Sequence, residues 1–130
     1  MKDYKEQTVD LYLTPIEKGK EVRLNNLFFE FDKAVLKSSS YAELNRLAKV
    51  LKNTNTSSIE IGGHTDDKGT SAYNLELSEQ RAAAVVTYLV TKGVDAAKLK
   101  AIGYGESKPL VKNSSDENRA VNRRVEFKIR

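Results

Sequence analysis

The chain has 130 residues, of which 39% are hydrophobic and 31% charged, with a net charge of +4 and no cysteine. This length and composition are typical of one globular domain with a single core. Without cysteine, the chain can form no disulfide, thiol nucleophile or zinc–thiolate site. Its one histidine, His64, cannot build a zinc site alone, because such sites need several protein ligands. We therefore expect no metal and no other cofactor.

The distribution of charge and the N-terminal sequence restrict the classes of partner and the location. Basic residues are spread along the whole chain and do not cluster beside aromatic residues, so we do not expect nucleic acid as a partner. No apolar run reaches the length of about 18 residues that a membrane-spanning helix needs. The first residues, MKDYKEQTVD, contain no apolar segment typical of a signal peptide. The protein is then either cytoplasmic or a fragment with an export signal upstream, and both remain open.

The first part of the chain contains a polar segment and then a predicted strand. Residues 1–21 are polar and mixed in character, with a short alternating piece ended by Pro15, and we expect a linker or an edge strand there. Residues 22–31, VRLNNLFFEF, carry alternating apolar and aromatic side chains, which predict a strand. We therefore expect the folded domain to span residues 22–130.

Two amphipathic helices with a strand between them are predicted next. Residues 38–53 place apolar side chains at i, i+3, i+4 and i+7, and the serine run 38–40 is expected to cap this helix. Residues 59–63 predict a short buried strand. The second helix is expected to begin with Thr70 or Ser71 as its N-cap and to end near Lys92, before a glycine. Its apolar stripe consists of Ala82, Val85, Val86 and Leu89.

The last part of the chain predicts two further strands. Residues 98–104 form the third strand after a short turn, and residues 105–118 are expected to be a loop, since they contain a proline and a polar run. Residues 123–130 alternate cleanly and predict the final strand. The resulting order is strand, helix, strand, helix, strand, loop, strand. It implies an α/β (α+β) sandwich with helices packed on a mixed four-stranded sheet.

The segment from Ile61 to Arg81 combines a buried strand, an acidic glycine turn and the start of a helix. Asp66 and Asp67 lie in the turn, where aspartates commonly do no more than bond turn amides. The helix favours a second interpretation, because Asn74, Ser78 and Arg81 fall at i, i+4 and i+7 and so share one face. Asp66 is nearby, and the N-terminus of the helix favours an anion. This polar face therefore suits a small zwitterion, whose ammonium would bind Asp66 and whose carboxylate would bind Arg81.

The final strand raises a separate question about two adjacent arginines. Alternation places Val125, Phe127 and Ile129 on one face and Arg124, Glu126 and Lys128 on the other. Arg123 then falls on the apolar face, where an arginine should be paired with either a structural carboxylate or a ligand. We expect Arg124, on the opposite face, to matter less for stability.

Several separated motifs resemble one known family. The string GHTDDKGTSAYNLELSEQRAAAVVTYLVTKGV, followed by IGYGESKP and NRRVEF, resembles the OmpA C-terminal-like family of peptidoglycan-binding domains, to which Pal lipoproteins and MotB-type stator proteins belong. The upstream FFEFDKAVL is similar to that family's first strand and turn. The resemblance covers roughly residues 24–130. It implies a sandwich of the kind predicted above.

The resemblance also implies a ligand and the residues that hold it. Members of the family hold the diaminopimelate residue of the peptidoglycan stem peptide without covalent chemistry. Asp66 of the HTD motif and Arg81 of the LSxxR motif match the positions that contact this residue, and Asn74 matches a helix asparagine of the family. The full set of expected ligand-binding residues is Thr65, Asp66, Asn74, Leu77, Ser78, Arg81 and Arg123.

The segment before the domain suggests a larger protein. DLYLTPIEKGKEVRLNN is similar to the entry to such domains in multidomain outer-membrane proteins. The resemblance therefore implies a monomeric cell-wall anchor of a longer exported protein, at the periplasmic face of the outer membrane. An association with a type IX secretion assembly is a further expectation.

A cell-wall hydrolase is the alternative that the sequence has to exclude. His64 lies two residues before Asp66, but no nucleophile motif accompanies it, so we expect a structural role for this histidine. Asp66 and Asp67 are adjacent in one turn, and they lack the separation across a cleft that paired carboxylates need for glycoside hydrolysis. We therefore expect a binding domain and no catalytic residues.

Overall fold

The computed structural model describes residues 19–24, 27–30, 33–53 and 58–130. One sheet has the strand order β1-β4-β2-β3, with strands β1 (Glu21–Leu24), β2 (Ile59–His64), β3 (Leu99–Gly105) and β4 (Arg124–Ile129). β4 runs antiparallel to β1 and β2, while β2 and β3 are parallel. The predicted α/β class with a mixed four-stranded sheet is confirmed.

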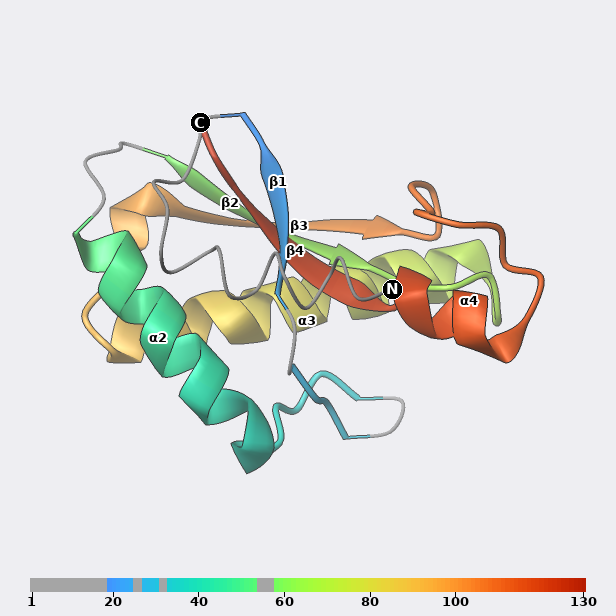
Figure 1. Cartoon of the computed structure of the whole chain (residues 1–130), viewed down its shortest axis with the longest axis horizontal. Helices are drawn as coiled ribbons and strands as arrows, with labels where there is room; N and C mark the ends of the chain where they lie inside the picture. Colours follow the sequence, from blue (N-terminus) through green and yellow to red (C-terminus); the bar gives the residue numbers. More distant parts are fainter. Residues whose placement is uncertain (1–18, 25–26, 31–32, 54–57) are drawn as a thin grey trace.

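In the described part of the chain, three α-helices accompany the sheet: α2 (Tyr41–Lys52), α3 (Ser71–Thr91) and α4 (Asp116–Asn122). Short 3-10 turns, η1 (Ser38–Ser40) and η2 (Ala96–Lys98), precede α2 and β3. Helix α4 and the start of α3 lie at the same end of the molecule, where β4 begins and β2 ends (Figure 1). None of the helices in the described part of the chain is long and apolar enough to cross a membrane.

The core lies between the helices and one face of the sheet. Because side chains alternate along a strand, every second residue of β2 and β4 points into this layer. These residues pack against the leucines of α2 and the apolar stripe of α3. The fully buried members are Leu44, Leu47, Leu51, Ile59, Ile61, Ala82, Val85, Leu89 and Phe127, and the predicted Val86 packs against them as a partly buried side chain.

Helix α3 has the predicted bounds, whereas the start of α2 differs from the prediction. The Thr70 hydroxyl accepts the N–H of Tyr73 and so caps α3, as expected. The serine run before α2 makes no such cap and instead forms the 3-10 turn η1. The Ser40 hydroxyl accepts the N–H of Phe28 at 2.7 Å and donates to the carbonyl oxygen of Phe28 at 2.9 Å. This serine therefore ties residues 27–30 to the start of α2.

Two other predictions need correction, and one lies outside the described residues. The predicted strand 22–31 is shorter, because β1 ends at Leu24 and Phe29 forms only an isolated bridge with Leu36. The predicted loop 105–118 contains the first residues of α4, whose N-cap Ser115 accepts the N–H of Asn118. Residues 1–18 lie outside the described residues, so the boundary between a segment 1–21 and a domain 22–130 stays a prediction.

The face of the sheet opposite the helices carries buried charged side chains. Arg124 is only 7% exposed; its Nε donates to Oε2 of Glu126 at 2.8 Å and its Nη2 donates to the carbonyl oxygen of Lys108 at 2.9 Å. Nε2 of His64 lies 3.5 Å from Oε1 of the same glutamate. We therefore reverse the expectation that Arg124 matters less for stability than Arg123, because both faces of β4 are buried.

Replacement of Arg124 by alanine should destabilise the protein by about 3–5 kcal/mol, since it leaves a buried carboxylate without its main cation. Arg119→Ala is the matched control: Arg119 pairs with Asp67 on the surface at 3.0 Å, and such pairs contribute about 0–1 kcal/mol. Urea unfolding monitored by circular dichroism measures both free energies. Equal losses in the two variants would contradict the structural role of Arg124.

The same buried pair predicts a loss of stability in acid. Burial alone would raise the pKa of Glu126, but the contacts with His64 and Arg124 outweigh burial and lower this pKa from 4.5 to about 2. The stabilisation from this carboxylate is therefore complete above pH 4.5 and is lost as the pH falls toward 2. Glu126→Gln should flatten the decline in unfolding free energy over that range. Glu117→Gln, on the exposed surface of α4, is the control and should keep the wild-type slope.

Candidate ligand-binding site

A cavity of about 600 Å³ lies between the turn after β2, the first half of α3 and the segment that follows β1. Six of the seven predicted binding residues line this cavity, and they come from three separate motifs of the sequence. They are Thr65, Asp66, Asn74, Leu77, Arg81 and Arg123. The fold thus brings the HTD turn, the LSxxR helix and the start of the last strand to one surface.

Asp66 provides a fixed carboxylate at this cavity. Its Oδ1 accepts the N–H of Lys68 at 2.9 Å, so the aspartate does bond the turn, as the simpler interpretation of the sequence expected. Its Oδ2 accepts a hydrogen bond from Nη1 of Arg123 at 2.6 Å. Because an ionised carboxylate offers about four acceptor positions, two internal bonds leave capacity for a ligand cation.

Asn74 holds the turn against the start of α3. It is 3% exposed, and its amide donates to the carbonyl oxygen of Lys68 at 2.8 Å and to Oε1 of Glu106 at 2.9 Å. The backbone N–H of Thr65 donates to Gly105, and the Thr65 hydroxyl donates to the carbonyl oxygen of Asp66. These bonds fix the backbone on both sides of the Asp66 carboxylate.

Arg81 lines the same cavity from the third turn of α3. Its Nε donates to the carbonyl oxygen of Lys33 at 2.9 Å, and its guanidinium lies 4.9 Å from the centre of the Phe29 ring. The carbonyl and the ring together fix the plane of the guanidinium. The position therefore combines a delocalised cation with an aromatic surface.

Ser78 is the one predicted binding residue that lies away from the cavity. It is 1% exposed; its hydroxyl donates to the carbonyl oxygen of Leu75 and accepts the N–H of Gly105 at 2.9 Å. This serine therefore joins α3 to the end of β3. Its helical spacing from Asn74 and Arg81 is as predicted, but the face that it shares with Asn74 is buried against the sheet.

Arg123 pairs with a carboxylate, as expected, but its location differs from the prediction. It lies at the C-terminal end of α4, one residue before β4, and its side chain is 48% exposed. The alternation of the strand does not extend to it, because the chain is still turning out of α4. Its partner, Asp66, is 57 residues away in the sequence.

Sequence reasoning missed the aromatic and basic residues that complete the cavity. The segment before α2 contributes two phenylalanines, of which Phe28 is 47% exposed, and α3 contributes Tyr73, which is 43% exposed. The alternating FFEF motif predicted only a strand, and no other feature of the sequence indicated that its phenylalanines line a cavity. The complete set of missed lining residues is Leu27, Phe28, Phe29, Lys37, Lys68 and Tyr73.

The described residues contain no cluster of three or more histidine, aspartate or glutamate side chains that could hold a metal ion. The two turn aspartates are each in an ion pair instead, Asp66 with Arg123 and Asp67 with Arg119. The arrangement offers one carboxylate and two guanidinium groups around an open cavity. Chemically, it can bind a ligand that carries both signs of charge.

Comparisons with known proteins agree with the fold and with the motifs. The model of the OmpA family matches residues 28–123. Outer membrane porin F of Pseudomonas aeruginosa is 47% identical over 102 residues, which make up 78% of this chain and 29% of the porin. The chain therefore spans less than a third of that relative.

Two solved structures show the same architecture. The peptidoglycan-associated lipoprotein from Burkholderia pseudomallei superimposes with a TM-score of 0.72 at 35% identity, covering 80% of this chain and 88% of the lipoprotein. The cell wall anchor of the type VI secretion system from Pseudomonas aeruginosa gives a TM-score of 0.74 at 27% identity, covering 97% and 93% of the two chains. From the family match, the sequence identity and the shared fold together, this chain belongs to the OmpA family.

Proposed function

We propose that this domain binds peptidoglycan without catalysis, through the free end of a diaminopimelate residue in the stem peptide. One observation carries the proposal: the Asp66 carboxylate and the Arg81 and Arg123 guanidinium groups line one open cavity. The relatives with a peptidoglycan-associated or cell-wall-anchoring name support the same ligand class.

The chemistry of diaminopimelate matches this arrangement of charges. Its free end carries an ammonium and a carboxylate on a single carbon, and three methylene groups connect that carbon to the peptide. The ammonium would bond to Asp66 and the carboxylate to Arg81. Leu77 and Phe28 supply apolar surface on the same cavity for the methylene groups.

The ion pairs of the turn support binding without catalysis. Asp66 and Asp67 are adjacent in one turn, and they pair with Arg123 and Arg119, respectively. The two carboxylates therefore do not face one another across the cavity. General acid–base hydrolysis of a sugar bond needs two carboxylates on opposite sides of that bond. Incubation of the purified domain with sacculi should therefore give binding without any fall in turbidity.

The same ligand suggests the location and the larger context. Peptidoglycan lies in the periplasm, so we propose that the domain anchors an outer-membrane-associated protein from its periplasmic face, and that it does so as a monomer. The association with a type IX secretion assembly stays a prediction. One of the solved structures that this fold resembles anchors a type VI system instead.

Replacement of Asp66 or Arg81 by alanine should weaken binding to sacculi by about tenfold to a hundredfold. Each change removes a charge-assisted hydrogen bond to the ligand, which contributes about 1.5–3 kcal/mol. Pull-down with purified sacculi, quantified over a range of protein concentrations, measures the change. Circular dichroism checks that each variant is folded.

Asp67→Ala and Arg119→Ala are the matched controls for this experiment. They remove the same charges from the same turn and from α4, but neither residue lines the cavity. Both controls should bind sacculi as the wild type does. If the four variants behave alike, binding depends on the general charge of this surface and the proposed site is wrong.

Stem peptides with lysine in place of diaminopimelate should bind about tenfold to a hundredfold more weakly. Lysine keeps the ammonium but lacks the carboxylate, so Arg81 loses its ligand partner at a cost of about 1.5–3 kcal/mol. Calorimetry with matched peptides of the two types measures the difference. Equal affinities would show that recognition depends on the glycan or on the shared part of the peptide.

A further inference from the structure

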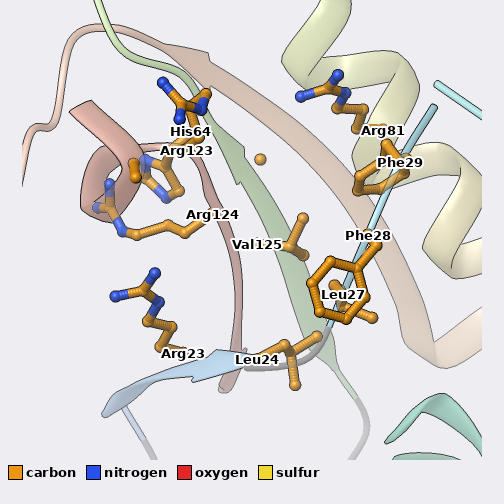
Figure 2. Close-up of a pocket in the computed structure, with 12 residues that line it drawn as sticks. Arg23, Leu24, Leu27, Phe28, Phe29, His64, Arg81, Arg123, Arg124 and Val125 are labelled. Carbon is orange, nitrogen blue, oxygen red and sulfur yellow. The ribbon is translucent and has the colours of Figure 1, made fainter. Parts of the chain in front are cut away.

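A second cavity, of about 350 Å³, adjoins the first where β4 begins and β2 ends. It is bounded by β1, β2, β4 and the segment after β1, and Figure 2 shows the side chains that line it. The two cavities have lining residues in common, which are Leu27, Phe28, Phe29, Arg81 and Arg123. Because they share these side chains, one ligand of sufficient length can occupy both.

The polar lining of this second cavity is cationic. Four arginines line it, Arg23 from β1, Arg81 from α3, Arg123 before β4 and Arg124 from β4, and no carboxylate side chain of the described residues is among the lining (Figure 2). Glu126, the partner of Arg124, lies outside the lining. A cavity with this composition favours an anionic group.

Arg124 has hydrogen-bonding capacity that the described residues leave unused. Its three printed bonds go to Glu126, to the carbonyl oxygen of Asn122 and to that of Lys108. A guanidinium has five N–H groups, so two of them have no acceptor among the described residues. Since the side chain is only 3% exposed, water compensates little for them.

His64 provides an independent indication of a ligand. Its side chain is 2% exposed and lines the second cavity. Nε2 lies 3.5 Å from Oε1 of Glu126, the contact that helps to lower the pKa of that carboxylate, whereas the buried Nδ1 has no hydrogen-bond partner among the described residues. The ring itself is fixed by stacking on Tyr104, with 5.0 Å between centroids. Buried polar groups are rarely left unbonded, so this imidazole indicates a missing partner.

We propose that the second cavity is an anion subsite for a carboxylate on the stem-peptide residue next to diaminopimelate. This inference rests on the proposed function and extends it. The neighbouring glutamate is joined to diaminopimelate through its side-chain carboxyl group, so its α-carboxylate remains free. That carboxylate would accept bonds from His64 and Arg124.

Three ligands separate this subsite from the first cavity. They are diaminopimelate alone, γ-D-glutamyl-diaminopimelate with its free α-carboxylate, and the same dipeptide with that group converted to a carboxamide. The last two differ by a single charge. We expect the acid to bind about tenfold more tightly than the amide, since one charge-assisted hydrogen bond is lost on amidation.

The single histidine of the chain supplies a local signal. In nitrogen-detected NMR spectra of the imidazole, the acid dipeptide should shift the His64 resonances, whereas diaminopimelate alone and the amide should leave them nearly unchanged. Arg23→Gln, on the edge strand β1, removes a neighbouring cation from the cavity lining and should lower the affinity for the acid by more than the affinity for the amide. Arg119→Gln, outside both cavities, should retain the difference.

The outcomes distinguish failure of this inference from failure of the proposed function. If diaminopimelate binds but acid and amide have equal affinities and the His64 signals do not move, the second subsite is wrong and the first cavity stands. If the acid binds more tightly without any His64 shift and equally in Arg23→Gln, the carboxylate binds elsewhere and the subsite is wrong. If none of the three ligands binds, both proposals fail.

Discussion

The close packing of α3 on β2 and β3 is the constraint on which the site depends. A Cβ atom at Gly63 would lie 2.2 Å from the carbonyl oxygen of Ser78, and one at Gly103 would lie 2.5 Å from the amide nitrogen of Glu79. The helix backbone can approach the strands this closely only because both positions are glycine. The approach places Asn74 within bonding distance of the turn that carries Asp66, and it sets where Arg81 emerges one turn after Ser78.

The pair of Asp66 and Arg123 connects the two halves of the site. It joins the turn after β2 to the junction of α4 and β4, so the position of α4 affects the Asp66 carboxylate. α4 is itself held by Asn122, whose side chain accepts the N–H of Leu110 and donates to Val111 in the preceding loop. The loop before α4, helix α4 and the Asp66 turn are therefore connected through hydrogen bonds.

The sequence predicted the elements with strong periodicity and failed where a local tertiary contact decides the structure. The bounds of α3 and of the last three strands follow from apolar spacing and caps, and six of seven predicted binding residues line one cavity. The serine run 38–40 failed as a cap, because Ser40 bonds Phe28, a contact that no local pattern reveals. Arg124 was misjudged because alternation gives the face of a strand but not whether that face is covered.

The internal bonds of the binding side chains determine how efficiently they can hold a ligand. Asp66 is already held by Lys68 and Arg123, and Arg81 by Lys33 and the ring of Phe29. Ordering a long side chain on binding costs about 0.5–1.5 kcal/mol. Here the internal bonds already order these side chains in the folded protein, so binding would not add that cost. Because the Asp66 carboxylate offers about four acceptor positions and uses two of them internally, these contacts orient its charge without exhausting it. On the proposed function, a preorganised site of this kind would hold a flexible cell-wall polymer through a single residue of its peptide.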